Sequence, residues 1–126
     1  MTVLKTIGSK VWAIPGGHMP LLSSGAEPRD TSRDELCVLN AGHFDAHLQL
    51  TIYYEDREPV GPYPLKVVAQ RVRHVRFNDL IDPHALPLDT PYAVLVVADH
   101  PVVVQFTRRD TSQAANAIAT TLAYPG

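Results

Sequence analysis

The sequence of 126 residues contains a single cysteine, Cys37, so it cannot form an internal disulfide or a cysteine-rich zinc site. Positive charge is not in excess, because 11 Lys and Arg residues stand against 13 Asp and Glu, a net charge of −2. This balance argues against a general binder of nucleic acid or of anionic membranes. The chain has no run of 18 apolar residues, and its first nine residues lack the apolar stretch of a signal peptide. We therefore expect a soluble, cytoplasmic protein.

Catalytic templates are also missing from the sequence. It has no G-x-S-x-G elbow, HExxH helix, P-loop or GxGxxG loop. Glu55, Asp56 and Glu58 cluster around an arginine on a turn bounded by proline, which is typical of a solvated hairpin tip rather than an acid–base pair. His43 and His47 stand at a spacing that diverges across a turn and a strand. We predict no catalytic residues, no metal and no cofactor, and hence no enzyme. A gathering of the six histidines around a metal is the alternative.

Proline is the residue type in excess. Eleven prolines and seven glycines are spread along the whole chain instead of being concentrated in a linker. Proline at this density excludes long helices and punctuates short extended segments. No internal repeat or change in composition divides the chain, so we predict a single domain over residues 1–126.

Eight segments are predicted as short strands, because they are rich in β-branched and aromatic residues or alternate between apolar and polar residues. They are residues 10–14, 36–40, 46–55, 65–69, 71–77, 93–98, 102–108 and 114–123. The last is rich in alanine, so a helix is its alternative. The spacing predicts an all-β fold, an antiparallel β-sandwich of about eight strands that is similar to a jelly roll. Because an open sandwich has strand edges that must be paired or blunted, we also expect a symmetric oligomer.

Three local patterns make narrower predictions. Residues 93–98 are continuously apolar, which is typical of a strand covered on both faces. Residues 99–101 (Asp-His-Pro) resemble a tight hairpin turn into the next strand. Val75 and Phe77 are two residues apart and share one strand face, whereas Val72 falls on the opposite face. This mismatch indicates either a late strand start or a β-bulge.

Polar side chains stand at the ends of two predicted strands. They are Arg76, Asn78 and Asp79 in one set and Gln105, Thr107 and Arg108 in the other. Strand alternation places Gln105 and Thr107 on one face. Arginine forks and side-chain amides bind anions and hydroxyls in a bidentate manner, so these residues fit a hydroxyl-rich or anionic small ligand. The alternative is a scaffold role, with Asn78 and Asp79 capping a turn and Arg108 in an exposed ion pair.

Trp12, the only tryptophan, has two interpretations. It joins the candidate ligand-binding residues as an aromatic platform for a sugar ring, and its alternative is an anchor in the core. Cys37 lies between Leu36 and Val38, so we expect an inert thiol in the core. Residues 71–76 carry three arginines, a pattern that is typical of a solvated face but also suits phosphate or an acidic segment.

Several segments, taken in order, resemble the sensory rhodopsin transducer family of the Anabaena type. They are residues 11–14, 25–28, 37–42, 51–54 with 58–63, 74–80, 89–90 and 103–108. The match spans residues 8–124, and its specificity lies in the order and spacing of all the segments together. The sequence departs from the family mainly at residues 16–19.

The resemblance implies a jelly-roll-like β-sandwich that assembles as a tetramer. It also implies a cytoplasmic, non-enzymatic transducer that contacts the cytoplasmic face of a membrane photoreceptor, with DNA as a linked target that the net charge here disfavours. The same sandwich resembles carbohydrate-binding modules, so a module that binds a small sugar-like ligand is the alternative function. The resemblance supplies no catalytic residues.

Overall fold

The structure is a computed structural model that describes residues 6–20, 32–110 and 117–126. Within these residues the chain forms eight β-strands and one short 3₁₀ helix, η1. Their bounds are β1 (Ser9–Gly17), β2 (Arg33–Asn40), β3 (Ala46–Tyr54), β4 (Val60–Val67), β5 (Arg71–Arg76), η1 (Phe77–Asp79), β6 (Tyr92–Asp110), β7 (Ala117–Leu122) and β8 (Tyr124–Pro125). The final segment is therefore a strand over residues 117–122 and not a helix, while residues 114–116 lie outside the described residues.

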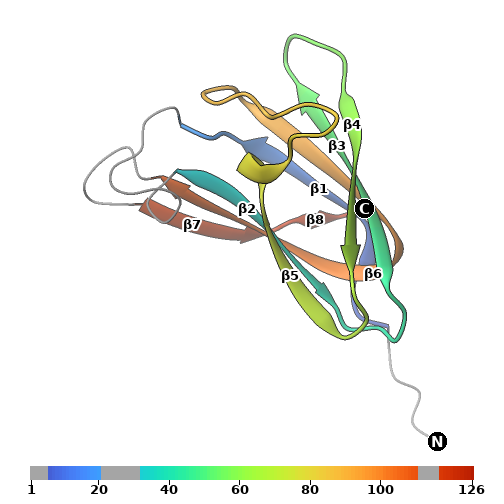
Figure 1. The fold of residues 1–126 in the computed structure, drawn as a ribbon. Coiled ribbons are helices and arrows are strands. Elements are labelled where there is room, and N and C mark those ends of the chain that lie inside the picture. Colours follow the sequence, from blue (N-terminus) through green and yellow to red (C-terminus); the bar gives the residue numbers. More distant parts are fainter. Residues whose placement is uncertain (1–5, 21–31, 111–116) are drawn as a thin grey trace, which may run out of the picture.

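The strands form two antiparallel sheets that share β6. Sheet A has the order β4-β3-β6-β1-β8, and sheet B has the order β5-β2-β6-β7. Residues 92–98 of β6 pair with β1 and β3, whereas residues 103–110 pair with β2 or β7. Figure 1 shows β6 as a long curved strand that passes through both layers. The predicted all-β antiparallel sandwich of about eight strands is confirmed.

Period-two alternation builds the core between the sheets. In β3, Leu48, Leu50 and Ile52 are buried, while His47 and Gln49 are exposed. Each large apolar side chain buried in this way stabilises the fold by about 1.5–3 kcal/mol. The largest fully buried side chains also include Tyr63, Phe77, Met19, Leu36, Val38 and Val96.

The predicted hairpin at residues 99–101 is wrong, because β6 continues through this segment without reversing. Oδ1 of Asp99 accepts a hydrogen bond from the backbone N–H of His47 (2.7 Å), and Oδ2 of Asp99 lies 3.2 Å from Nδ1 of the His47 ring. Further along β6, the Val102 carbonyl accepts a hydrogen bond from the indole N–H of Trp12 (2.9 Å). Partners in sheet A thus satisfy these polar groups while the chain crosses into sheet B.

The expectation that residues 93–98 are covered on both faces is also wrong. Val94, Val96 and Ala98 are buried, but Val97 on the opposite face is 44% exposed. The apolar run of β6 therefore has one buried face and one face that is partly open.

The irregularity predicted for β5 does not occur. β5 pairs with β2 in continuous register, without a bulge. Val72 lies on the outer face of sheet B, where it is exposed opposite the exposed Leu39. The position of Val72 therefore reflects an exposed apolar pair with Leu39 and not a break in the strand.

Candidate functional site

The register of sheet B brings three of the predicted site residues together on its outer face. Arg76 pairs with Glu35, Glu35 pairs with Thr107, and the neighbouring strands extend these pairs into rows. We call the two adjacent rows the polar face of sheet B: Arg76, Glu35, Thr107 and Thr120 in one row and His74, Cys37, Gln105 and Leu122 in the next. Arg76 thus shares one sheet face with Gln105 and Thr107, although β2 lies between them and they are far apart in the sequence.

Hydrogen-bonding groups on this face are only partly engaged with one another. The hydroxyl groups of Thr107 and Thr120 lie 3.0 Å apart. The Nε–H group of Arg76 is buried, yet it has no hydrogen-bond partner among the described residues. Because a buried donor without a partner is costly, its presence marks a position that a polar ligand group or water can satisfy.

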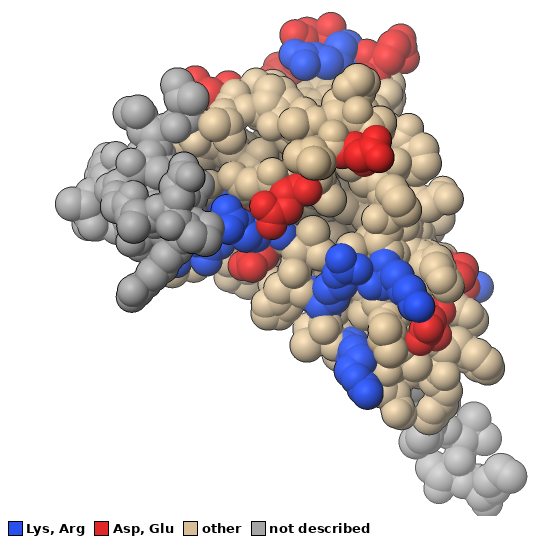
Figure 2. Space-filling model, viewed as in Figure 1, with Lys and Arg blue, Asp and Glu red and all other residues tan. Residues whose placement is uncertain are grey.

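A cavity of about 330 Å³ adjoins Arg76 at the junction of β4, β5 and η1. Arg73, His74 and Arg76 line it together with the carboxylate residues Glu35 and Asp79. Figure 2 shows that Lys and Arg side chains gather along β5 and beside β4 on this side of the molecule. The cavity therefore combines guanidinium groups with two carboxylates, a set that suits hydroxyl groups or a zwitterionic partner surface.

Asn78 and Asp79 belong to η1 and not to a strand, so the alternation of β5 ends before them. The Asn78 side-chain amide donates to the Ser32 carbonyl (3.2 Å), while its buried Oδ1 has no partner among the described residues. Asp79 is exposed and lines the same cavity as Arg76. Both residues thus lie at the margin of the polar face of sheet B.

Arg108 lies on the opposite side of sheet B from Gln105 and Thr107. Its Nε donates to Oδ1 of Asp34 (3.2 Å), and its Nη2 donates to the Gly16 carbonyl (3.2 Å). Asp34 is fully buried, and its Oδ2 also accepts from the Tyr92 hydroxyl (2.5 Å) and the backbone N–H of His18 (2.9 Å). Arg108 is therefore committed to a buried charge network and is not part of the polar face.

Burial and the neighbouring Asp34 carboxylate raise the pKa of Tyr92 far above its ordinary value. The phenol therefore stays protonated and serves as a permanent hydrogen-bond donor to Asp34. Alternation in β2 places Asp34 on the same buried face as Leu36 and Val38, a signal that the sequence analysis missed.

Trp12 lies in the core, where it is 4% exposed. Its indole N–H is shared between the carbonyls of Ser9 and Val102, at 2.9 Å each. This position matches the core-anchor interpretation, and Trp12 is not brought together with the other predicted site residues.

Cys37 is on the polar face of sheet B, so its expected position in the core is wrong. Partial burial raises the pKa of the thiol, and the Glu35 carboxylate raises it further. The thiol is therefore held in its protonated form at neutral pH.

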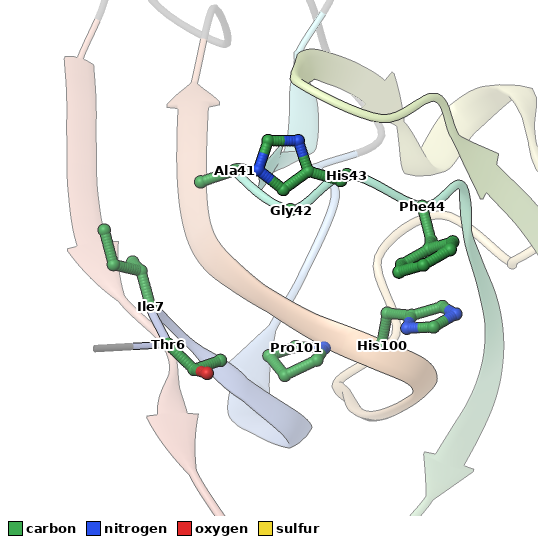
Figure 3. A pocket seen from close by; sticks show the side chains of 8 residues that line it. All are labelled: Thr6, Ile7, Ala41, Gly42, His43, Phe44, His100 and Pro101. Carbon is green, nitrogen blue, oxygen red and sulfur yellow. The ribbon is translucent and has the colours of Figure 1, made fainter. Parts of the chain in front are cut away.

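A second cavity, of about 370 Å³, was not predicted from the sequence. Figure 3 shows Phe44 and His100 on one side of it, Thr6 and Ile7 on the other, and His43 and Pro101 between them. The lining residues come from three separate parts of the chain, so no local sequence motif predicts the cavity. The one available signal is an aromatic residue that closely follows the Ala41–Gly42 turn.

Among the described residues, no three His, Cys, Asp or Glu side chains are grouped so that they could share a metal ion. No helix in the described ranges is long and apolar enough to cross a membrane. The described strands define a β-sandwich protein with a polar outer face on sheet B.

Comparison with known proteins identifies the family. Residues 7–125 match the family model described as "Anabaena sensory rhodopsin transducer". The structure of the Anabaena sensory rhodopsin transducer itself is 46% identical, with a TM-score of 0.70, and the match covers 82% of this chain and 99% of that one. The chain belongs to the Anabaena sensory rhodopsin transducer family, a family of signalling transducers, as its sequence segments indicate.

A second solved structure extends the likeness. The crystal structure of Thermotoga maritima 1070 is 27% identical, with a TM-score of 0.83, and the match covers 94% of this chain and 96% of that one. The search of curated protein sequences returned no match.

Proposed function

We propose that this protein is a non-enzymatic, cytoplasmic adaptor that binds a receptor partner or a small ligand through the polar face of sheet B. The observation that carries the proposal is that Arg76, Gln105 and Thr107 share one sheet surface. The name of the related Anabaena protein supports a sensory rhodopsin as the partner, contacted on its cytoplasmic face. The margin residue Asp79 extends this surface to the cavity beside Arg76, and Asn78 precedes it in η1.

The adaptor works as a homo-oligomer in this proposal, with a tetramer as the expected state. The support is the open edge of β7, which pairs only with β6 among the described strands. Edges of this kind are usually protected by charged residues or proline. Residues 117–122 contain neither, whereas β5 carries three arginines and β4 carries two prolines. The β7 edge is thus the one best suited to pair with another copy of the chain.

Binding to a purified Anabaena-type sensory rhodopsin in detergent tests the proposed function. We expect the double substitution Arg76→Ala and Thr107→Val to weaken binding by tenfold or more, in keeping with about 1.5–3 kcal/mol for hydrogen bonds to charged groups. Arg57→Ala is the matched control, because Arg57 pairs with Asp56 at an exposed turn and does not belong to the polar face. Equal binding by the double variant and the control would remove the polar face from the proposal.

The alternative function is a carbohydrate or small-molecule binding module linked to sugar metabolism. The amide of Gln105, the hydroxyl of Thr107 and the guanidinium of Arg76 on one sheet face favour it, because sugars are recognised by such groups. A thermal-shift screen against monosaccharides and sugar acids tests this alternative. A ligand at a hundred times its dissociation constant stabilises the fold by about 2.7 kcal/mol.

DNA is a disfavoured partner because the net charge is −2. If DNA binds through phosphate neutralisation, affinity falls steeply as salt rises. Binding that is weak and insensitive to salt would argue against a DNA-directed role.

A further inference from the structure

The cavity in Figure 3 shares no residue with the polar face of sheet B. With a volume of about 370 Å³, it falls at the lower end of the range for small-molecule sites. Its wall is mainly apolar, from Ile7, Phe44 and Pro101, and the side-chain polar groups are two imidazoles and one hydroxyl. An apolar wall with a few polar groups is the general character of a small-molecule site.

The loop that carries Phe44 is fixed by hydrogen bonds to the buried side-chain amide of Asn40. The side chain of Asn40 is fully buried; it donates to the carbonyls of Phe44 (2.8 Å) and Val67 (3.0 Å) and accepts from the backbone N–H of Gly42 (3.0 Å). The Gly42 carbonyl accepts in turn from the backbone N–H of Gln70 (3.1 Å). A fixed loop loses little conformational freedom when it binds a ligand.

This rigid loop nevertheless leaves an aromatic ring in solvent. Phe44 is 69% exposed, and its ring stacks on that of His100 with centroids 5.4 Å apart and planes 14° apart. Two stacked rings at the side of a cavity favour a third flat ring, which can pack in an offset or edge-to-face arrangement.

The imidazole of His43 supplies a hydrogen-bond donor at the same cavity. Its Nδ1 lies 3.4 Å from the side-chain nitrogen of Gln70, and because that nitrogen can only donate, Nδ1 accepts. The ring proton therefore resides on Nε2, which has no partner among the described residues. In the described part of the chain no carboxylate lines the cavity, and the nearby Asp45 and Asp99 are paired with Lys66 and His47.

We propose that this cavity is a binding site for a small planar aromatic acid. The aromatic ring packs beside Phe44 and His100, and the carboxylate accepts a hydrogen bond from Nε2 of His43. This site is independent of the partner-binding face proposed above, so each proposal can fail without the other.

Indole-3-acetate is the probe, and its matched analogues are 3-methylindole, which lacks the carboxylate, and cyclohexylacetate, which lacks the aromatic ring. We expect indole-3-acetate to shift the backbone amide NMR signals of residues 41–44 and of His100. Cyclohexylacetate should bind about tenfold more weakly, since it cannot form the ring contacts. Shifts confined to other residues, or no shift with indole-3-acetate, would overturn the proposal without the need for a variant.

Two substitutions assign the roles of the side chains. Phe44→Leu should weaken indole-3-acetate about tenfold, while Tyr53→Leu, a change of another exposed ring outside this cavity, should leave binding unchanged. His43→Ala should weaken indole-3-acetate but not 3-methylindole, because only the acid uses Nε2. Equal affinity of the wild type and Phe44→Leu would contradict the site.

Discussion

The hydroxyl group of Tyr92 lies 2.5 Å from Oδ2 of Asp34, and this contact joins β6 of sheet A to β2 of sheet B inside the protein. Asp34 is fully buried, and the guanidinium of Arg108 and the backbone N–H of His18 complete its partners. A buried carboxylate with this many donors is stable only while all of them are in place.

Replacement of Asp34 by alanine should strongly destabilise the fold. The change leaves the Tyr92 hydroxyl and Nε of Arg108 without their acceptor, so we expect a loss of about 3–5 kcal/mol in the free energy of unfolding. Urea denaturation measures the loss, and Asp56→Ala, at an exposed ion pair, should leave the free energy of unfolding nearly unchanged. Equal midpoints for the two variants would show that the buried network contributes little.

The Tyr92 phenol should make the protein sensitive to alkaline pH. Its pKa is raised in the folded state, whereas in the unfolded chain it is near 10.0. Above that pH the unfolded chain loses the Tyr92 proton and the folded chain keeps it, so stability falls by up to about 1.4 kcal/mol per pH unit. The stability advantage of the wild type over Tyr92→Phe should therefore shrink above pH 10. Parallel stability curves for the two proteins would refute this assignment.

Two neighbouring glycines should respond oppositely to the same substitution. A Cβ at Gly17 would lie 2.3 Å from ring carbons of Tyr92, and the ring is held by its bond to Asp34. A Cβ at Gly16 would meet nothing within 4 Å. We expect Gly17→Ala to cost about 1–3 kcal/mol, and Gly16→Ala to be neutral or slightly stabilising. Thermal unfolding of both variants provides the comparison, and equal melting temperatures would contradict the close approach.

Oligomer assembly should depend on the backbone of β7. The Ala123 N–H donates to the Val104 carbonyl, and antiparallel alternation then directs the N–H groups of Ile118, Thr120 and Leu122 to the open edge. Thr120→Pro removes one of these outward donors, and proline is tolerated on an edge strand. Light scattering should report a smaller assembly for this variant, with circular dichroism as the check on folding. An unchanged molar mass would exclude the β7 edge as the contact.

The sequence predicts the β-sandwich well because most strands carry their own signal. The alternation of Leu48, Leu50 and Ile52 identifies β3 without any knowledge of its neighbours. The path of β6 could not be predicted in this way. Asp99 and Pro101 look like turn residues locally, but whether the chain reverses or bends depends on the contact of Asp99 with His47, which is 52 residues away.

The site was predictable only where alternation applies. The shared face of Gln105 and Thr107 follows from their spacing within one strand. The opposite orientation of Arg108 follows from the same rule, but its partner Asp34 is 74 residues away and no local pattern points to it. The cavity beside Phe44 depends on the turn held by Asn40 and on the bend near His100, so it exists only in the folded chain.

The 19-residue β6 is a single strand that belongs to both sheets. Neither sheet can unfold alone, because each sheet forms backbone hydrogen bonds with the same continuous strand. Amide hydrogens along both halves of β6 should consequently exchange with deuterium through one cooperative opening. The free energy of that opening should be the same in the two sheets and equal to the free energy of global unfolding.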